Sequence, residues 1–167
     1  TPTAFGVQVS QSHAPTDAKV PSPYRETVVT LPEGAQLTGA TNSDGNLVVC
    51  APNQFESAPN SLAPVTCPAG SAIGSLELVS PLVGTLNGTV YLAAKAGGAD
   101  DIVQLFMVAQ KGAQADAVRV KLKARVEINP TTGRLVATLT DLPPQPTTSF
   151  KFTFRSGTAP AMRQPRT

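Results

Sequence analysis

The stretch Val118–Ile128, VRVKLKARVEI, alternates apolar and charged residues without interruption. A period of two puts every second side chain on one face of an extended strand, whereas a helix repeats every 3.6 residues. The pattern therefore predicts a long strand with one face in a core and one in solvent. Strands of this type belong to antiparallel sheets.

Turn residues divide the rest of the chain into short runs. The 16 Pro and 13 Gly of the 167 residues fall between apolar runs, where they favour turns. The runs predict about eight or nine strands of ordinary length. We expect strands within 4–10, 26–37, 47–50, 73–79, 86–95, 102–110, 118–128, 134–139 and 150–155.

Short strands joined by Gly and Pro turns are typical of an all-β fold. We expect one antiparallel β-sandwich domain of the Ig-like, Greek-key type over residues 1–157, followed by a linker or tail over 158–167. One helical turn at most is expected, near Asn53–Ser57. The pair Asn87-Gly88 predicts a hairpin turn. The predicted core between two sheets is Phe106, Leu122, Leu139, Phe150, Phe152 and Phe154.

Cys50 and Cys67 are the two cysteines of the chain. An even pair in a β domain rich in Pro and Gly favours a disulfide and an oxidising compartment, and a buried free pair is the alternative. The longest apolar runs are far shorter than the ~20 residues of a membrane helix, so no membrane insertion is expected. These features favour a secreted or cell-surface location.

Charge is distributed unevenly along the chain. Residues 1–110 hold three cations and eight acids, and residues 111–167 hold ten cations and three acids. Such a split indicates an anionic partner for the second part, or pairing inside the protein. The candidate face for an anionic ligand consists of Arg119, Lys121, Lys123, Arg125, Lys151 and Arg155.

Residue types that carry catalysis are sparse. His13 is the only histidine and lies in a polar segment, so we expect no nucleophile–base pair and no enzymatic activity. The pair Asp100-Asp101 and the Asn42-Ser-Asp44-Gly-Asn46 stretch contain oxygen ligands, but the distal Glu of a calcium loop is missing. We expect no metal and no cofactor. Nucleic acid is not expected, because no aromatic residue stands among the cations of 118–128.

Two stretches, 67–94 and 118–157, carry a recurring set of turn and strand-start residues. They are similar to segments of long secreted actinobacterial surface proteins that contain repeated modules of unknown function. The matching residues are Cys67, Pro68, Ser71, Gly74, Gly88, Val90, Tyr91, Leu92, Gly133, Leu142, Pro143, Pro146 and Phe150.

The resemblance implies a non-enzymatic structural or adhesive module of an extracellular surface protein, with neighbouring modules of the same polypeptide as partners. The alternative is a binding module for an anionic cell-wall polymer or glycan, which would use the basic face. Tandem copies in the full-length protein would favour the first interpretation.

Overall fold

The computed structural model describes residues 5–10, 26–33, 35–37, 39–56, 63–94, 101–112, 118–140, 142, 147–154 and 162–163. Eight strands form one antiparallel sheet in the order β1-β9-β4-β5-β6-β7-β8-β2, and β10 pairs with β3 in a small second sheet. The strands are β1 (Phe5–Ser10), β2 (Thr27–Thr30), β3 (Gln36–Leu37), β4 (Ala72–Ser80), β5 (Gly84–Ala93), β6 (Asp101–Lys111), β7 (Val118–Ile128), β8 (Leu135–Thr140), β9 (Ser149–Phe154) and β10 (Met162–Arg163). The helical segments are α1 (Pro52–Phe55) and the 3-10 turn η1 (Ala69–Ser71).

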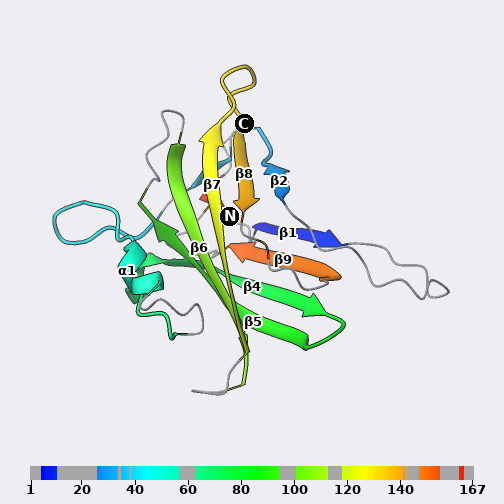
Figure 1. Cartoon of the computed structure of the whole chain (residues 1–167). Coiled ribbons are helices and arrows are strands. Elements are labelled where there is room, and N and C mark those ends of the chain that lie inside the picture. The colour runs from blue at the N-terminus through cyan, green and yellow to red at the C-terminus, as the bar shows by residue number, and fades with distance from the viewer. Residues whose placement is uncertain are drawn as a thin grey trace.

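The large sheet curls into a half-barrel, in which β9 and β4 run across the direction of β7 and β8 (Figure 1). The prediction of an all-β antiparallel fold is confirmed. A two-sheet Greek-key sandwich is not confirmed, because β4 to β8 follow one another as a meander within one sheet. The right-handed twist of neighbouring strands accumulates across such a sheet and curls it around its own apolar face.

The alternation in β7 gives the predicted result. Val120, Leu122, Ala124 and Val126 are buried on the inner face of the half-barrel. The prediction of a strand over Val118–Ile128 is confirmed with the same bounds.

The inner core contains five of the six predicted core residues, namely Leu122, Leu139, Phe150, Phe152 and Phe154. Phe106 is also buried, but it belongs to a separate cluster with Phe55, so its placement in the inner core was wrong. Successive residues of a strand point to opposite faces. Leu105 and Met107 point inward with the inner core, and Phe106 therefore points outward.

Asn87-Gly88 does not form the predicted hairpin turn. Both residues lie inside β5, and the turn between β4 and β5 comes before Gly84, whose φ is +78°. A Cβ on Gly88 would lie 1.6 Å from the carbonyl oxygen of Val108. Gly88 is therefore needed for the close approach of β5 to β6.

The predicted helical turn is confirmed as α1, which begins at Pro52. Pro suits the first position of a helix because its missing N–H would have no partner there. The side chain of Gln54 accepts a hydrogen bond from the backbone N–H of Ala51 at 2.9 Å, which closes the start of the helix. No helix within the described ranges is long and apolar enough to cross a membrane.

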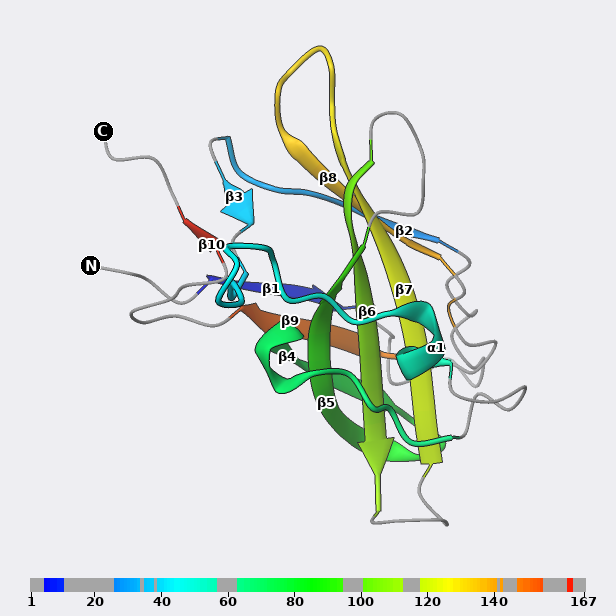
Figure 2. The ribbon, with the colours of Figure 1, turned by 90° about the vertical axis from the view of Figure 1, so that its left-hand side faces the viewer.

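The two ends of the described chain lie against the body of the fold. β1 pairs with β9, with Phe5 opposite Phe154 and Ser10 opposite Ser149. In the stretch expected to be a tail, Met162 and Arg163 form β10 and pair with Leu37 and Gln36 of β3. Figure 2 shows β10 and β3 together at one side of the half-barrel.

Candidate functional site

The sulfur atoms of Cys50 and Cys67 lie 1.96 Å apart, so the two residues form the predicted disulfide. Their separation in sequence is 17 residues, and α1 lies in the segment between them. The backbone N–H of Cys50 donates to the carbonyl oxygen of Leu92 at 2.7 Å. The disulfide therefore fastens both ends of the α1 segment beside strand β5.

The ring of Phe55, at the end of α1, packs against the outer face of the sheet. It stacks on Phe106 of β6 with the ring centroids 4.5 Å apart and an angle of 17° between the ring planes. The outer cluster, as we call it, is completed by Cys50, Ala93 and Val108, and all five residues are buried. Val65, Cys67 and Tyr91 pack against its edge.

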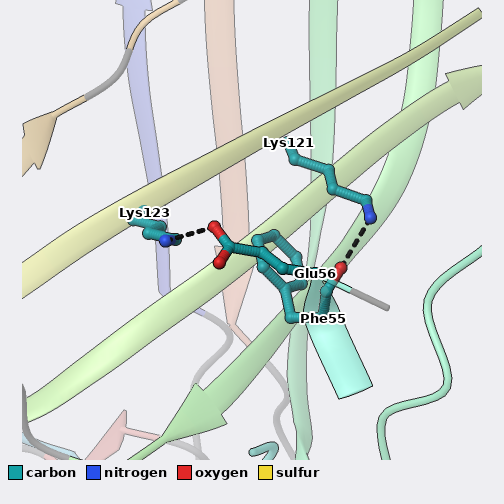
Figure 3. A network of polar contacts seen from close by, with 4 residues as sticks. All are labelled: Phe55, Glu56, Lys121 and Lys123. Carbon is teal, nitrogen blue, oxygen red and sulfur yellow. Dashed lines mark hydrogen bonds and ion pairs between the residues drawn. The ribbon is translucent and has the colours of Figure 1, made fainter. Parts of the chain in front are cut away.

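Lys121 and Lys123 of β7 lie over this cluster (Figure 3). The ammonium group of Lys121 donates a hydrogen bond to the carbonyl oxygen of Phe55, and that of Lys123 forms an ion pair with Glu56. The Lys121 nitrogen is 5.3 Å from the centre of the Phe55 ring. The Lys123 nitrogen is 5.9 Å from the centre of the Phe106 ring. Both cations therefore hold α1 against the sheet.

The register of the sheet explains why these two lysines reach α1. Lys121 lies opposite Val108 and Lys123 lies opposite Phe106, so both stand beside the outer cluster on the same face of the sheet. Their aliphatic stems cover apolar surface while the ammonium groups reach polar atoms. Burial lowers the pKa of Lys121 below its usual value of 10.5, and the neighbouring charge of Glu56 offsets part of this effect.

The two arginines of β7 also have acceptors nearby. Arg119 donates from Nε to the side-chain oxygen of Gln110 at 3.1 Å. Arg125 forms an ion pair with Glu127 at 2.8 Å, with about 44% of its side chain exposed. The four cations predicted as one face therefore share one side of β7, and each contacts an acceptor in the protein.

The remaining residues of the predicted basic face do not extend this row. Lys151 is exposed on β9, which is separated from β7 by β4, β5 and β6, and it lies in register with Glu77 of β4. Arg155 lies outside the described residues.

Of the candidate ion ligands, Asn42, Asp44 and Asn46 form an ordinary turn, and Asp101 begins β6. The side-chain oxygen of Asn42 accepts hydrogen bonds from the backbone N–H groups of Asp44 at 3.0 Å and Asn46 at 2.9 Å. His13 and Asp100 lie outside the described residues. Within the part of the chain that the structure describes, no group of three or more His, Cys, Asp or Glu residues could hold a metal ion.

The sequence did not single out Phe55 and Glu56, which receive the two lysines. Phe55 is the one aromatic residue between Cys50 and Cys67, and this was the available signal. No family model, curated protein or solved structure matches this chain.

Proposed function

We propose that this chain is a non-enzymatic structural or adhesive module of an extracellular surface protein, with neighbouring modules of the same polypeptide as its partners. The observation that carries the proposal is the disulfide between Cys50 and Cys67. Disulfides persist in oxidising compartments and are rare in the cytosol. The resemblance to modules of actinobacterial surface proteins supports the same location.

The use of the charged residues supports a structural role. Lys121 and Lys123 bind the carbonyl oxygen of Phe55 and the carboxylate of Glu56, which belong to the segment closed by the disulfide. Ligand-binding cations would be expected to present free donors to solvent. Here the cations and the disulfide act on the same short segment and fix it to the sheet.

Location can be tested on intact producing cells with an amine reagent that does not cross membranes. Lys111 and Lys151 are exposed, and Lys151 serves as the reporter because Lys111 donates to the carbonyl oxygen of Val83. An extracellular module should be labelled at Lys151 before lysis. Labelling that requires lysis would contradict the proposal. As an internal control, a cytosolic protein of the same cells should remain unlabelled.

The alternative function is a binding module for an anionic cell-wall polymer or glycan. The observation that favours it is the placement of Arg119 and Arg125 on the same side of one strand as the two lysines. We would replace Arg119 and Arg125 together by Ser and keep Lys121 and Lys123, which hold the α1 segment. Lys151→Ser is the control. The alternative requires lower retention on isolated cell walls for the double variant, and retention that falls as salt shortens the Debye length from ~10 Å at 0.1 M to ~3 Å at 1 M.

A further inference from the structure

A hollow of about 590 Å³ opens at one end of the half-barrel. Its wall is formed by Leu37 of β3, Leu92 of β5, Val103 of β6 and Leu135 of β8, together with residues from the segment that leads from β3 to Cys50. Every described residue that lines the hollow is Ala, Gly, Val, Leu or Ile. The described side chains of the lining therefore offer hydrocarbon contact, with no aromatic ring among them, and the polar surface of the wall comes from backbone groups.

The rim of this hollow is also apolar. Leu47 is 53% exposed, Ile102 is 42% exposed and Ile128 is 46% exposed, and all three border the hollow. The described residues include six large hydrophobic side chains that are exposed, so half of them surround this one feature. Single exposed apolar residues need no explanation, but a group of them around a concave site marks a binding surface.

The volume limits what can fill the hollow. Ligand sites in proteins usually measure about 300–1,000 Å³, and the mouths of β-barrels are common places for them. An apolar cavity of about 150 Å³ is already large enough for a benzene ring. A single side chain inserted by a partner protein would therefore leave most of this hollow empty. A longer hydrocarbon would occupy it.

The lining determines the chemistry of the ligand. The described side chains of the lining offer no hydrogen-bond partner, and a buried polar atom without one is costly, so the part of the ligand that lies against them should carry none. The absence of aromatic residues from the described lining removes the stacking contacts that a flat ring would use. We propose that the hollow formed by β3, β5, β6 and β8 binds the alkyl chain of a small lipid, such as a fatty carboxylate, and leaves the polar head in water. This activity goes beyond the structural role proposed above and does not depend on it.

Calorimetric titration with saturated carboxylates, from octanoate to tetradecanoate and below their micelle concentrations, tests the proposal. Burial of one methylene contributes about 0.8 kcal/mol, which corresponds to an increase in affinity of about fourfold per added carbon. We expect this increase to continue until the chain fills the hollow and then to stop. The heat capacity change on binding should be negative, because apolar surface is buried.

Two substitutions with matched exposure locate the site. Leu47→Asp places a charge on the rim, and Val28→Asp places one on β2 at a residue that is 55% exposed and does not line the hollow. We expect Leu47→Asp to weaken dodecanoate binding at least tenfold and Val28→Asp to change it less than twofold. Circular dichroism melting of both variants shows whether the fold is kept.

A third substitution tests the dependence on volume. Ala94 lines the hollow and is exposed, so Ala94→Phe should reduce its volume without disturbing the inner core. The chain length at which affinity stops rising should become shorter. Absence of binding across the whole series would overturn the proposal, as would equal weakening by Leu47→Asp and Val28→Asp. Binding to phosphatidylcholine vesicles without binding to free carboxylates would overturn it in favour of a membrane-surface contact.

Discussion

At the scale of single residues, the charged face of β7 serves the packing of the protein itself. The aliphatic stems of Lys121 and Lys123 lie over the outer cluster, and their ammonium groups bind the carbonyl oxygen of Phe55 and the carboxylate of Glu56. The alternation of β7 therefore places side chains on both faces of the sheet, with a different consequence on each. Leu122 and Ala124 enter the inner core, and the alternate residues Lys121 and Lys123 attach the α1 segment to the outer face of the sheet.

The lowered pKa of Lys121 should be visible in the pH dependence of stability. Between the pKa of the folded state and 10.5, the unfolded chain keeps a proton that the folded chain has lost. The free energy of unfolding therefore rises with pH in this window, and the full cost of burying the charge is present below it. Lys121→Met should remove this rise, as measured by urea unfolding from neutral pH to 10.5.

Lys121→Arg serves as the control for this measurement. Arginine stays protonated throughout the window, so it should also lack the rise while it retains a cation near Phe55. If the wild-type protein and both variants show the same slope, Lys121 does not titrate as its burial requires.

Gly88 provides a second test at this scale. A Cβ at this position would lie 1.6 Å from the carbonyl oxygen of Val108, which is backbone and cannot rotate away. We expect Gly88→Ala to separate β5 from β6 locally and to lower the melting temperature strongly or prevent folding. Gly6→Ala in β1 is the matched control, because its Cβ would meet the carbonyl oxygen of Phe152 at an ordinary 3.4 Å. Similar melting temperatures for the two variants would contradict this account of Gly88.

At the scale of elements, α1 is too short to be stable by its own hydrogen bonds. Isolated helices need about 12–15 residues to be even marginally stable in water. Here a four-residue helix is held by the disulfide, by the stacking of Phe55 on Phe106 and by the two lysines. The disulfide keeps the α1 segment close to the sheet, and the contacts of Phe55 and the two lysines determine its orientation.

Phe55→Ala should therefore destabilise the whole domain. Phe55 is 1% exposed, and truncation of a fully buried Phe costs about 3–5 kcal/mol. Leu82→Ala is the control, because Leu82 is 68% exposed. Chemical denaturation followed by circular dichroism measures both. A loss below about 1 kcal/mol for Phe55→Ala would show that the α1 segment can leave the sheet without consequence for the fold.

Reduction of the disulfide provides a separate test of the same element. In the chain-entropy model, a closed loop of this length stabilises the folded state by about 3 kcal/mol. Intact mass should rise on reduction by the mass of a pair of hydrogens, and the midpoint of denaturation should fall. Two free thiols in protein purified without reductant would contradict the disulfide.

Some elements could be predicted from the sequence and others could not, for physical reasons. The bounds of β7 follow from alternation, which is local information. Asn87-Gly88 misled because a close approach between two strands and a turn both require glycine, and the sequence does not distinguish them. The docking of α1 depends on Lys121 and Phe55, which are 66 residues apart, so no local pattern reports it.

At the scale of the whole molecule, the alternation of apolar and polar residues could not predict how many sheets the strands form. An inward-facing strand has the same pattern whether the opposite wall is a second sheet or the far side of the same curled sheet. In the inner core, Phe150 and Phe152 of β9 pack with residues of β7 and β8, which belong to the same sheet. A second sheet in the place of β7 and β8 would give the same sequence pattern. The hollow at the open end was also beyond prediction, because it is formed by the ends of several strands and by the segment before Cys50.

The pairing of β1 with β9 determines how the protein would respond to tension applied along its chain. Met162 and Arg163 of β10 are held by a ladder of two residue pairs, which should yield first. The load then reaches Phe5 and Phe154, which lie opposite each other at the same end of the β1–β9 ladder. Antiparallel hydrogen bonds lie perpendicular to the strands, and a force that separates Phe5 from Phe154 acts along these bonds. The residue pairs of the ladder therefore break one after another, whereas a force parallel to the strands would load all of them together. Single-molecule stretching between Phe5 and Phe154 should therefore open the ladder at lower force than stretching between Ser10 and Phe154, which loads opposite ends of the same pair of strands.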